Sequence, residues 1–112
     1  MAFQKITPAR LAQAASTTAF LAIYTCPSNT RTYVKDITVC NTTSGAVTLF
    51  VSLVPDQDTA GTANALFSGE SIAANTTFQW KGTQILNAAE TIQFKGGGTG
   101  LTIHVSGAEA VD

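Results

Sequence analysis

The stretch Val47-Thr48-Leu49-Phe50-Val51-Ser52-Leu53-Val54 has the clearest two-residue alternation of apolar side chains in the chain. A period of two is typical of a half-buried β-strand, because successive side chains point to opposite faces of a sheet. We therefore expect a strand over residues 46–54, with Val47 and every second residue after it facing the core. Phe50 falls on the other face, where an exposed phenylalanine indicates either a second sheet or a protein partner.

Similar short segments recur on both sides of this stretch and are separated by turn residues. They cover residues 19–26, 32–41, 65–68, 76–81, 91–95 and 101–106. Spacing of this kind favours a sandwich or barrel over alternating strands and helices. The sequence thus predicts an all-β fold: a single-domain antiparallel β-sandwich, jelly-roll-like, with seven to eight short strands.

The pattern also makes specific expectations about the faces and ends of these strands. We expect Tyr33 to face the core together with Ile37 and Val39. Residues 84–90 are expected to form a link, with Ile85 and its neighbour Leu86 tucked under the sandwich. Residues 107–112 are expected to form a frayed tail, as chain ends often do.

Residues 1–17 differ from the rest and are expected to form an N-terminal arm or short helix, with the sandwich over residues 18–112. Thr7-Pro8 followed by alanine-rich sequence supplies a helix cap and good helix formers. The helix would have only two turns and would be marginal alone. The competing interpretation is an extended arm that carries Phe3, Ile6 and Leu11 onto a neighbouring protein.

Composition limits the possible functions. The 112 residues suit one domain; 45% are hydrophobic, 12% are charged, and the net charge is −1. This balance argues against disorder, and six scattered basic residues argue against nucleic-acid binding. No apolar run approaches the about 20 residues of a membrane span, and no apolar segment of a secretory signal follows Lys5. We expect a protein that acts where it is made or leaves the cell inside an assembled particle.

Residues that could carry chemistry are few. His104 is the sole histidine and lies on the outward face of a predicted strand, with no nucleophile motif in the chain. Residues 95–100 are glycine-rich, but a strand rather than a helix follows them, so a hairpin turn is favoured over a phosphate loop. Asp56 and Asp58 share one polar loop that lacks a full set of calcium ligands. We therefore expect no enzyme activity, no catalytic residues, no metal and no cofactor.

The cysteines and the tryptophan also have simple structural interpretations. Cys26 and Cys40 lie too far apart along the expected hairpin for a disulfide, so both are expected to be free and buried. A bridge between chains or across sheets is the alternative. Trp80 shares a face with Phe78, which indicates a core pair; the alternative is a platform on which a sugar stacks.

Most of residues 18–111 resembles the small virion proteins of tailed bacteriophages. The resemblance rests on the hairpin Tyr24-Thr25-Cys26-Pro27-Ser28-Asn29-Thr30, the strand Lys35-Asp36-Ile37-Thr38-Val39-Cys40-Asn41-Thr42-Thr43, the run Leu86-Asn87-Ala88-Ala89-Glu90-Thr91-Ile92, and the closing segment 102–111. Cys26 departs from the aliphatic residue expected at its position. These motifs are turn and strand signals, so they imply a fold and a structural role rather than a reaction.

The resemblance implies a virion structural protein, and we expect a capsid decoration or cement protein that stabilises the assembled shell. Its partners would be major capsid or tail proteins and further copies of itself, and it would be located in the virion, assembled in the host cytoplasm. The expected contact residues are Phe3, Ile6, Leu11 and Phe50. The alternatives are a collar, tail or baseplate accessory protein, or a glycan-binding module that uses Trp80 or the loop at residues 55–64.

Overall fold

The computed structural model describes residues 5–111, which form eight strands and one short 3₁₀ turn. The strands are β1 (Lys5–Ala15), β2 (Leu21–Thr25), β3 (Thr30–Asn41), β4 (Val47–Val54), β5 (Ala65–Ile72), β6 (Thr77–Leu86), β7 (Thr91–Gly96) and β8 (Leu101–Val111). The turn η1 (Thr62–Asn64) lies in the loop between β4 and β5.

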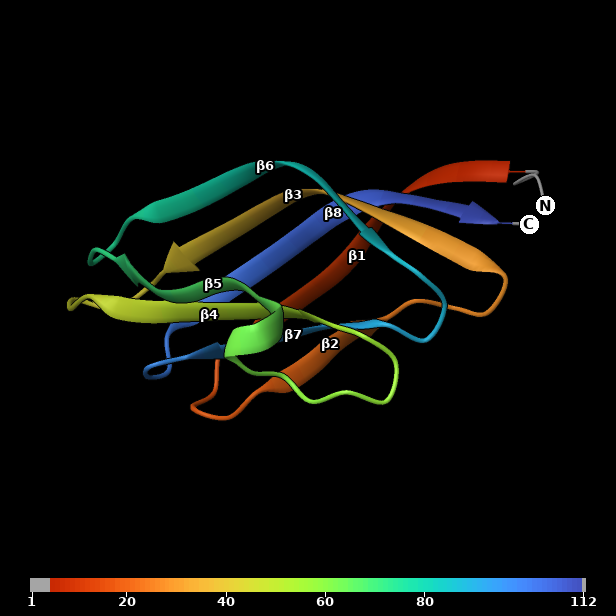
Figure 1. Ribbon diagram of the computed structural model, residues 1–112. Coiled ribbons are helices and arrows are strands. Elements are labelled where there is room, and N and C mark those ends of the chain that lie inside the picture. Colours follow the sequence, from red (N-terminus) through yellow and green to blue (C-terminus); the bar gives the residue numbers. More distant parts are fainter. Residues whose placement is uncertain (1–4, 112) are drawn as a thin grey trace.

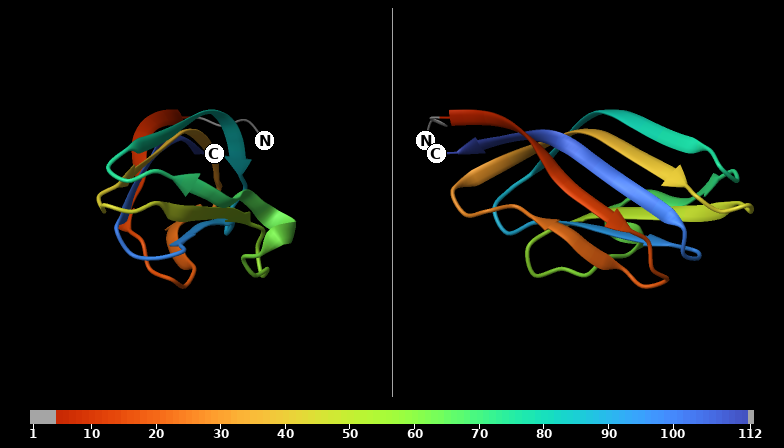
Figure 2. Two further views of the ribbon diagram at one scale, coloured as in Figure 1. Left: turned by 90° about the vertical axis from the view of Figure 1, so that its left-hand side faces the viewer. Right: turned by 180° about the vertical axis from the view of Figure 1, so that it is seen from behind.

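The strands form two four-stranded antiparallel sheets packed face to face (Figures 1 and 2). Sheet A has the order β1-β8-β3-β6, and sheet B has the order β2-β7-β4-β5. The chain pairs as nested partners, β1 with β8, β2 with β7, β3 with β6 and β4 with β5. This nesting is the jelly-roll arrangement, so the predicted antiparallel sandwich is confirmed.

The core lies between the two sheets and is built by alternate residues of the inner strands. Its largest fully buried side chain is Phe94, which follows the buried Ile92 at a spacing of two on β7. On β8 the alternate residues Leu101, Ile103 and Val105 are all fully buried. The alternation that predicted β7 and β8 is therefore the pattern that fills the core.

The segment expected to be a helix or a free arm is an edge strand. β1 pairs with β8 from Lys5 opposite Val111 to Ala15 opposite Thr102, and Ala12 is part of the buried core. Without β1 the backbone of β8 would have an unpaired edge, whereas a two-turn helix has little stability of its own. Pro8 is tolerated in β1 because the outer edge of this strand has no ladder partner. The division of the chain at residue 17 therefore does not appear in the fold.

Three other expectations were wrong. Residues 107–111 are not frayed but continue β8 between β1 and β3. β6 runs on to Leu86, which is buried, while Ile85 is 49% exposed rather than tucked under. A bulge at Lys35 in β3 shifts the register between Val34 and Asp36, so Tyr33 faces outward although Ile37 and Val39 face inward.

Both β1 and β8 have their free ends at the same end of the molecule (Figure 2). The turns between β3 and β4 and between β7 and β8 lie at the opposite end, as Figures 1 and 2 show. Among residues 5–111, the 55–64 loop and η1 lie beside sheet B rather than sheet A (Figure 1). That difference separates the two candidate interaction surfaces described next.

Candidate functional site

Sheet B presents a row of side chains that register places side by side on its outer face. Lys95 on β7 pairs with Phe50 on β4, which in turn pairs with Ser68 on β5. Phe20 immediately precedes the first paired residue of β2, so it falls on the other side of Lys95. The Lys95 Nζ lies 4.9 Å from the centre of the Phe20 ring and 4.7 Å from the centre of the Phe50 ring.

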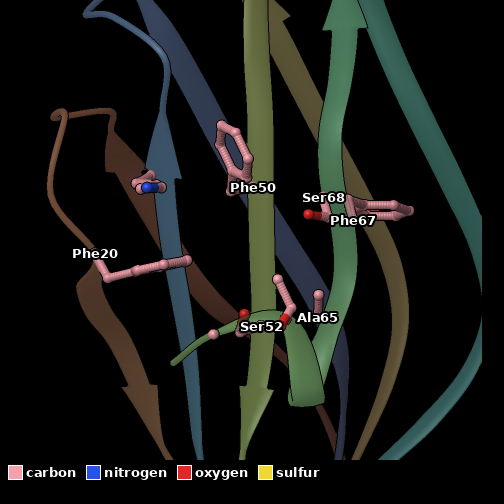
Figure 3. A pocket seen from close by; sticks show the side chains of 9 residues that line it. Phe20, Phe50, Ser52, Ala65, Phe67 and Ser68 are labelled. Carbon is pink, nitrogen blue, oxygen red and sulfur yellow. The ribbon is translucent and has the colours of Figure 1, made fainter. Parts of the chain in front are cut away.

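The chain between β4 and β5 closes one end of this row and creates a pocket of about 200 Å³ (Figure 3). Asn64 holds that chain in place: its side-chain amide donates to the Thr59 carbonyl oxygen and its Oδ1 accepts from the Gly61 N–H. Thr62 therefore reaches the pocket beside Ser52 of β4. We call this hollow the sheet B pocket; its principal lining residues are Phe20, Phe50, Ser52, Thr62, Ser68 and Lys95.

The side chains of the sheet B pocket combine an apolar rim with polar groups. In Figure 3 the rings of Phe20 and Phe50 stand on the same face of the sheet, whereas the ring of Phe67 points away from them. Phe67 packs edge to face against Phe78, at 5.3 Å between ring centres, and belongs to the edge of the core. Phe50 is thus an outward phenylalanine, as the sequence predicts, and it has an aromatic and a cationic neighbour.

Two polar groups of the pocket have no hydrogen-bonding partner in the described part of the chain. Within residues 5–111, the Lys95 ammonium makes no ion pair and no hydrogen bond; its contacts are the two ring faces. Ser52 is 1% exposed, yet its hydroxyl makes no hydrogen bond to another described residue. Since no fully enclosed polar atom of the described chain lacks a partner, the Ser52 hydroxyl must open into the pocket.

Sheet A carries a second candidate surface on its outer face, near the ends of β1 and β8. The pairing places Ile85, Tyr33, Ala108 and Pro8 in one row across β6, β3, β8 and β1, and Ile6 lies two residues before Pro8. Ile6 is 63% exposed and is the most exposed large hydrophobic residue of the described chain. We call these five residues the sheet A patch.

The predicted contact residues do not form one surface. Ile6 belongs to the sheet A patch and Phe50 to the sheet B pocket, on opposite faces of the sandwich. Leu11 is the bulge residue of β1 and packs against the core, so it is not a side chain of a free arm. Phe3 lies outside the described residues. Sequence reasoning missed Lys95, although its outward position next to the inward Phe94 was a readable signal.

The residues considered for catalysis or metal binding are dispersed. His104 is half-buried on the outer face of sheet A, opposite Gln13 and Thr38. Asp58 accepts a hydrogen bond from the Thr59 N–H within the exposed loop. No cluster of three or more histidine, cysteine or acidic residues that could hold a metal ion occurs in residues 5–111.

The inner surface near the ends of β2 and β8 contains a hydrogen-bonded group. The Tyr24 hydroxyl donates to Glu109 Oε2 at 2.5 Å and lies 2.7 Å from Thr32 Oγ1, which itself lies 3.2 Å from Cys26 Sγ. Burial, reinforced by the hydrogen bond to Glu109, raises the pKa of the Tyr24 hydroxyl above its ordinary value. Burial also raises the pKa of the Cys26 thiol. This group joins sheet B to the end of β8.

Both cysteines are free. Cys26 is buried as expected, but the expectation that Cys40 is buried was wrong, because this side chain is half-buried. Trp80 packs against the core and lies edge to face with Phe67, at 6.4 Å between ring centres. The interpretation of Trp80 as a core residue therefore agrees with the structure, and a sugar platform on this side chain does not.

No protein-family model matches the chain, and no curated protein matches it in sequence. Solved structures match in fold. A protein of Bacillus endospore appendages, described as disulfide-linked pili, is 12% identical over 99% of this chain and 94% of that chain, with a TM-score of 0.52. A chain of the T13 particle of infectious bursal disease virus is 10% identical over 96% of this chain, with a TM-score of 0.54.

A chain of the infectious bursal disease virus Gx strain is 11% identical, with a TM-score of 0.50 and 96% of this chain covered. Our chain spans about a third of the length of these virus chains, 30% and 32%. At such low identity the likeness shows a shared fold. The matched proteins are components of virus particles and pili, and what this chain shares with them is the β-sandwich fold. That fold is the part of the phage resemblance that is confirmed. None of the helical structure in residues 5–111 is long or apolar enough to cross a membrane.

Proposed function

We propose that this chain is a non-enzymatic structural subunit of a virus particle, and more narrowly a decoration protein that binds and stabilises the assembled capsid of a tailed bacteriophage. The observation that carries the proposal is the jelly roll itself, which includes all eight strands from β1 to β8. The same fold occurs in chains of virus particles and of a pilus-like appendage, which supports a role in ordered assemblies.

The sheet A patch is the surface we propose for contact with the shell. It is apolar, it lies on a regular sheet face, and its two isoleucines, Ile6 and Ile85, are 63% and 49% exposed. Burying such side chains in a protein interface is favourable by about 25 cal/mol per Å² of apolar surface. A stable contact needs roughly 1,000 Å² or more in total, so the patch would form the centre of a larger interface. Many copies bridging neighbouring shell subunits would resist separation better than single contacts do.

The test compares particle binding by surface variants that keep the fold. Replacing Ile6 and Ile85 together by aspartate places two charges in the sheet A patch, and the variant should no longer co-sediment with particles assembled in the host. Leu21→Asp is the matched control, because Leu21 is 45% exposed but lies on β2 of sheet B. Deleting residues 1–16 is unsuitable, since it removes β1 from sheet A. Unchanged co-sedimentation of the double variant would exclude this patch.

Electron microscopy of native particles carrying a tagged chain then tests the location. Density on the capsid lattice supports a decoration protein, whereas density at the neck, tail or baseplate supports the collar or tail accessory alternative. A chain found only in the soluble fraction would overturn the virion proposal.

A self-assembling fibre subunit is a second candidate. It is favoured by the likeness to the endospore appendage protein, which covers 94% of that protein and 99% of this chain. Sedimentation velocity of the purified chain separates the two: a decoration protein stays a small oligomer in the absence of shells, and a fibre subunit polymerises.

A further inference from the structure

The sheet B pocket has the features of a ligand site, and we propose that it binds a carboxylate-bearing sugar residue of an acidic glycan. The site would act in addition to the proposed assembly role and uses the opposite face of the sandwich. It is built from three strands, the residue before β2 and the turn at η1. Each of its chemical groups matches one part of such a sugar.

The charge in the pocket has no acidic counterion among residues 5–111. The Lys95 Nζ sits between two phenylalanine rings, 4.9 and 4.7 Å from their centres, and no acidic side chain of residues 5–111 contacts it. The rings hold the ammonium in place by cation–π attraction but leave its three N–H donors free. A carboxylate that entered the pocket would accept charge-assisted hydrogen bonds from these N–H groups, and such bonds are stronger than those between neutral groups.

The hydroxyl groups of the pocket match the polar edge of a sugar ring. Ser52 is 1% exposed and its hydroxyl has no hydrogen-bond partner among the residues the structure describes, which costs free energy unless a ligand or water satisfies it. Ser68 and Thr62 add two exposed hydroxyls at the sides of the pocket, and Figure 3 shows the Ser68 oxygen on the β4 side of its strand. Together the three groups can donate to and accept from the hydroxyls of a ligand.

The apolar walls and the volume of the sheet B pocket favour a ligand with a single sugar ring. Phe20 and Phe50 are half-buried and keep ring surface open to the pocket. The negative face of an aromatic ring attracts the weakly positive C–H groups on the flat face of a pyranose. The volume of about 200 Å³ is below the roughly 300–1,000 Å³ of pockets for drug-sized ligands. A purely apolar side chain from a peptide would fit this space but would leave Ser52 unsatisfied.

The experiment is a titration of the ¹⁵N-labelled full chain, followed by amide chemical shifts, with methyl β-D-glucuronide. Saturable shifts should centre on Phe50, Ser68 and Lys95, and methyl β-D-glucoside, which differs by the carboxylate, should bind at least tenfold more weakly. Lys95→Met should weaken glucuronide binding at least tenfold, while Lys95→Arg should retain it. Ser52→Ala should also weaken binding.

Lys81→Met is the matched control, because it removes an exposed lysine on β6, and it should bind as the parent chain does. The Lys95→Met spectrum also shows directly whether the variant is folded. The proposal is overturned if glucuronide gives no saturable shifts, if glucoside binds equally well, or if Lys95→Met binds unchanged. It is also overturned if N-acetyl-phenylalanine binds the pocket and glucuronide does not, because the site would then be one for a peptide carboxylate. The Lys95→Met variant should still bind particles, because the proposed shell contact lies on sheet A. Particle binding and glucuronide binding can therefore be refuted independently of each other.

Discussion

Replacing Gly107 by alanine is the sharpest test of how β8 is built. Gly107 pairs with Ala9 on β1 and with Val34 on β3, so its backbone is fixed on both sides. A Cβ atom added there would lie 1.9 Å from the carbonyl oxygen of Tyr33 and 3.3 Å from Leu11 Cδ1. The first of these contacts is with backbone, which cannot rotate away as a side chain can.

The size of the effect follows from this geometry. Relieving the overlap requires β3 and β8 to separate by about 1 Å beyond the usual spacing of roughly 4.8 Å, which weakens the ladder hydrogen bonds on either side. Overpacking costs about 1–3 kcal/mol where neighbours can adjust, so we expect a loss of about 3 kcal/mol or more here. For a chain of this length the entropy of unfolding converts that loss to a fall in Tm of about 13 °C.

The assay is urea and thermal unfolding, with Gly98→Ala as the matched control. A Cβ added at Gly98 meets nothing within 4 Å, so this variant should stay within about 0.5 kcal/mol of the parent chain. If Gly107→Ala were as mild as Gly98→Ala, residues 107–111 would not be a strand between β1 and β3. The frayed tail predicted from the sequence would then be correct after all.

Three further predictions concern Tyr24 and the cysteines. Tyr24→Phe removes the hydroxyl that bonds Glu109 and Thr32, so the free energy of unfolding measured in urea should fall by about 2 kcal/mol. Tyr33→Phe is the control, because the Tyr33 hydroxyl has no partner in residues 5–111. An equal loss in both variants would contradict a stabilising role of the Tyr24 hydrogen bonds. The pKa values of Cys26 and Tyr24 are raised by burial above their ordinary 9.0 and 10.0, so the unfolded chain loses these protons first. The stability that these two raised pKa values contribute is complete below about pH 9 and is lost as the pH rises. The urea concentration at the midpoint of unfolding should therefore fall between about pH 9 and pH 11, and a constant midpoint would contradict the raised pKa values. Iodoacetamide at neutral pH should label the half-buried Cys40 but not Cys26, which is 2% exposed, until the chain unfolds. Mass spectrometry of tryptic peptides measures the order of labelling, and labelling of Cys26 before Cys40 would contradict this difference in burial.

The parts of the fold that the sequence predicts well are those governed by local alternation. Ile92 and Phe94 on β7, in the strand expected over residues 91–95, alternate with polar neighbours and face the core. The same rule placed Tyr33 on the wrong face, because the extra residue Lys35 in the β3 bulge exchanges the inward and outward positions on either side of it. Such a bulge leaves no local signal in the sequence.

The N-terminal segment shows how tertiary pairing overrides local preference. The alanine-rich sequence after Pro8 favours a helix by intrinsic propensity, yet β8 offers a full edge of hydrogen-bonding groups for an extended strand. Ser16 fixes the end of this pairing, since its hydroxyl accepts from the Leu101 N–H and donates to the Gly98 carbonyl oxygen. These partners lie more than 80 positions away in the sequence, beyond the reach of local patterns.

Only part of the sheet B pocket could be predicted from the sequence, for the same reason. Phe50 was recognised as an outward aromatic residue from β4 alone, but its neighbours Phe20 and Lys95 come from strands whose pairing depends on the whole topology. Which outward side chains meet across a sheet follows from register between distant strands, and the register is a product of the fold rather than of any one segment.

The nested pairing of the strands has a consequence for how the chain folds. Only β4 and β5 are neighbours in sequence among the four nested pairs, while β1 and β8 must meet from opposite ends of the chain. Closing such long loops costs entropy before any contact compensates for it, which slows folding to the millisecond-to-second range typical of β-sandwiches. We expect the β4–β5 hairpin to form early and the β1–β8 ladder to close last, so a nascent chain would acquire its finished surface only at the end of the process.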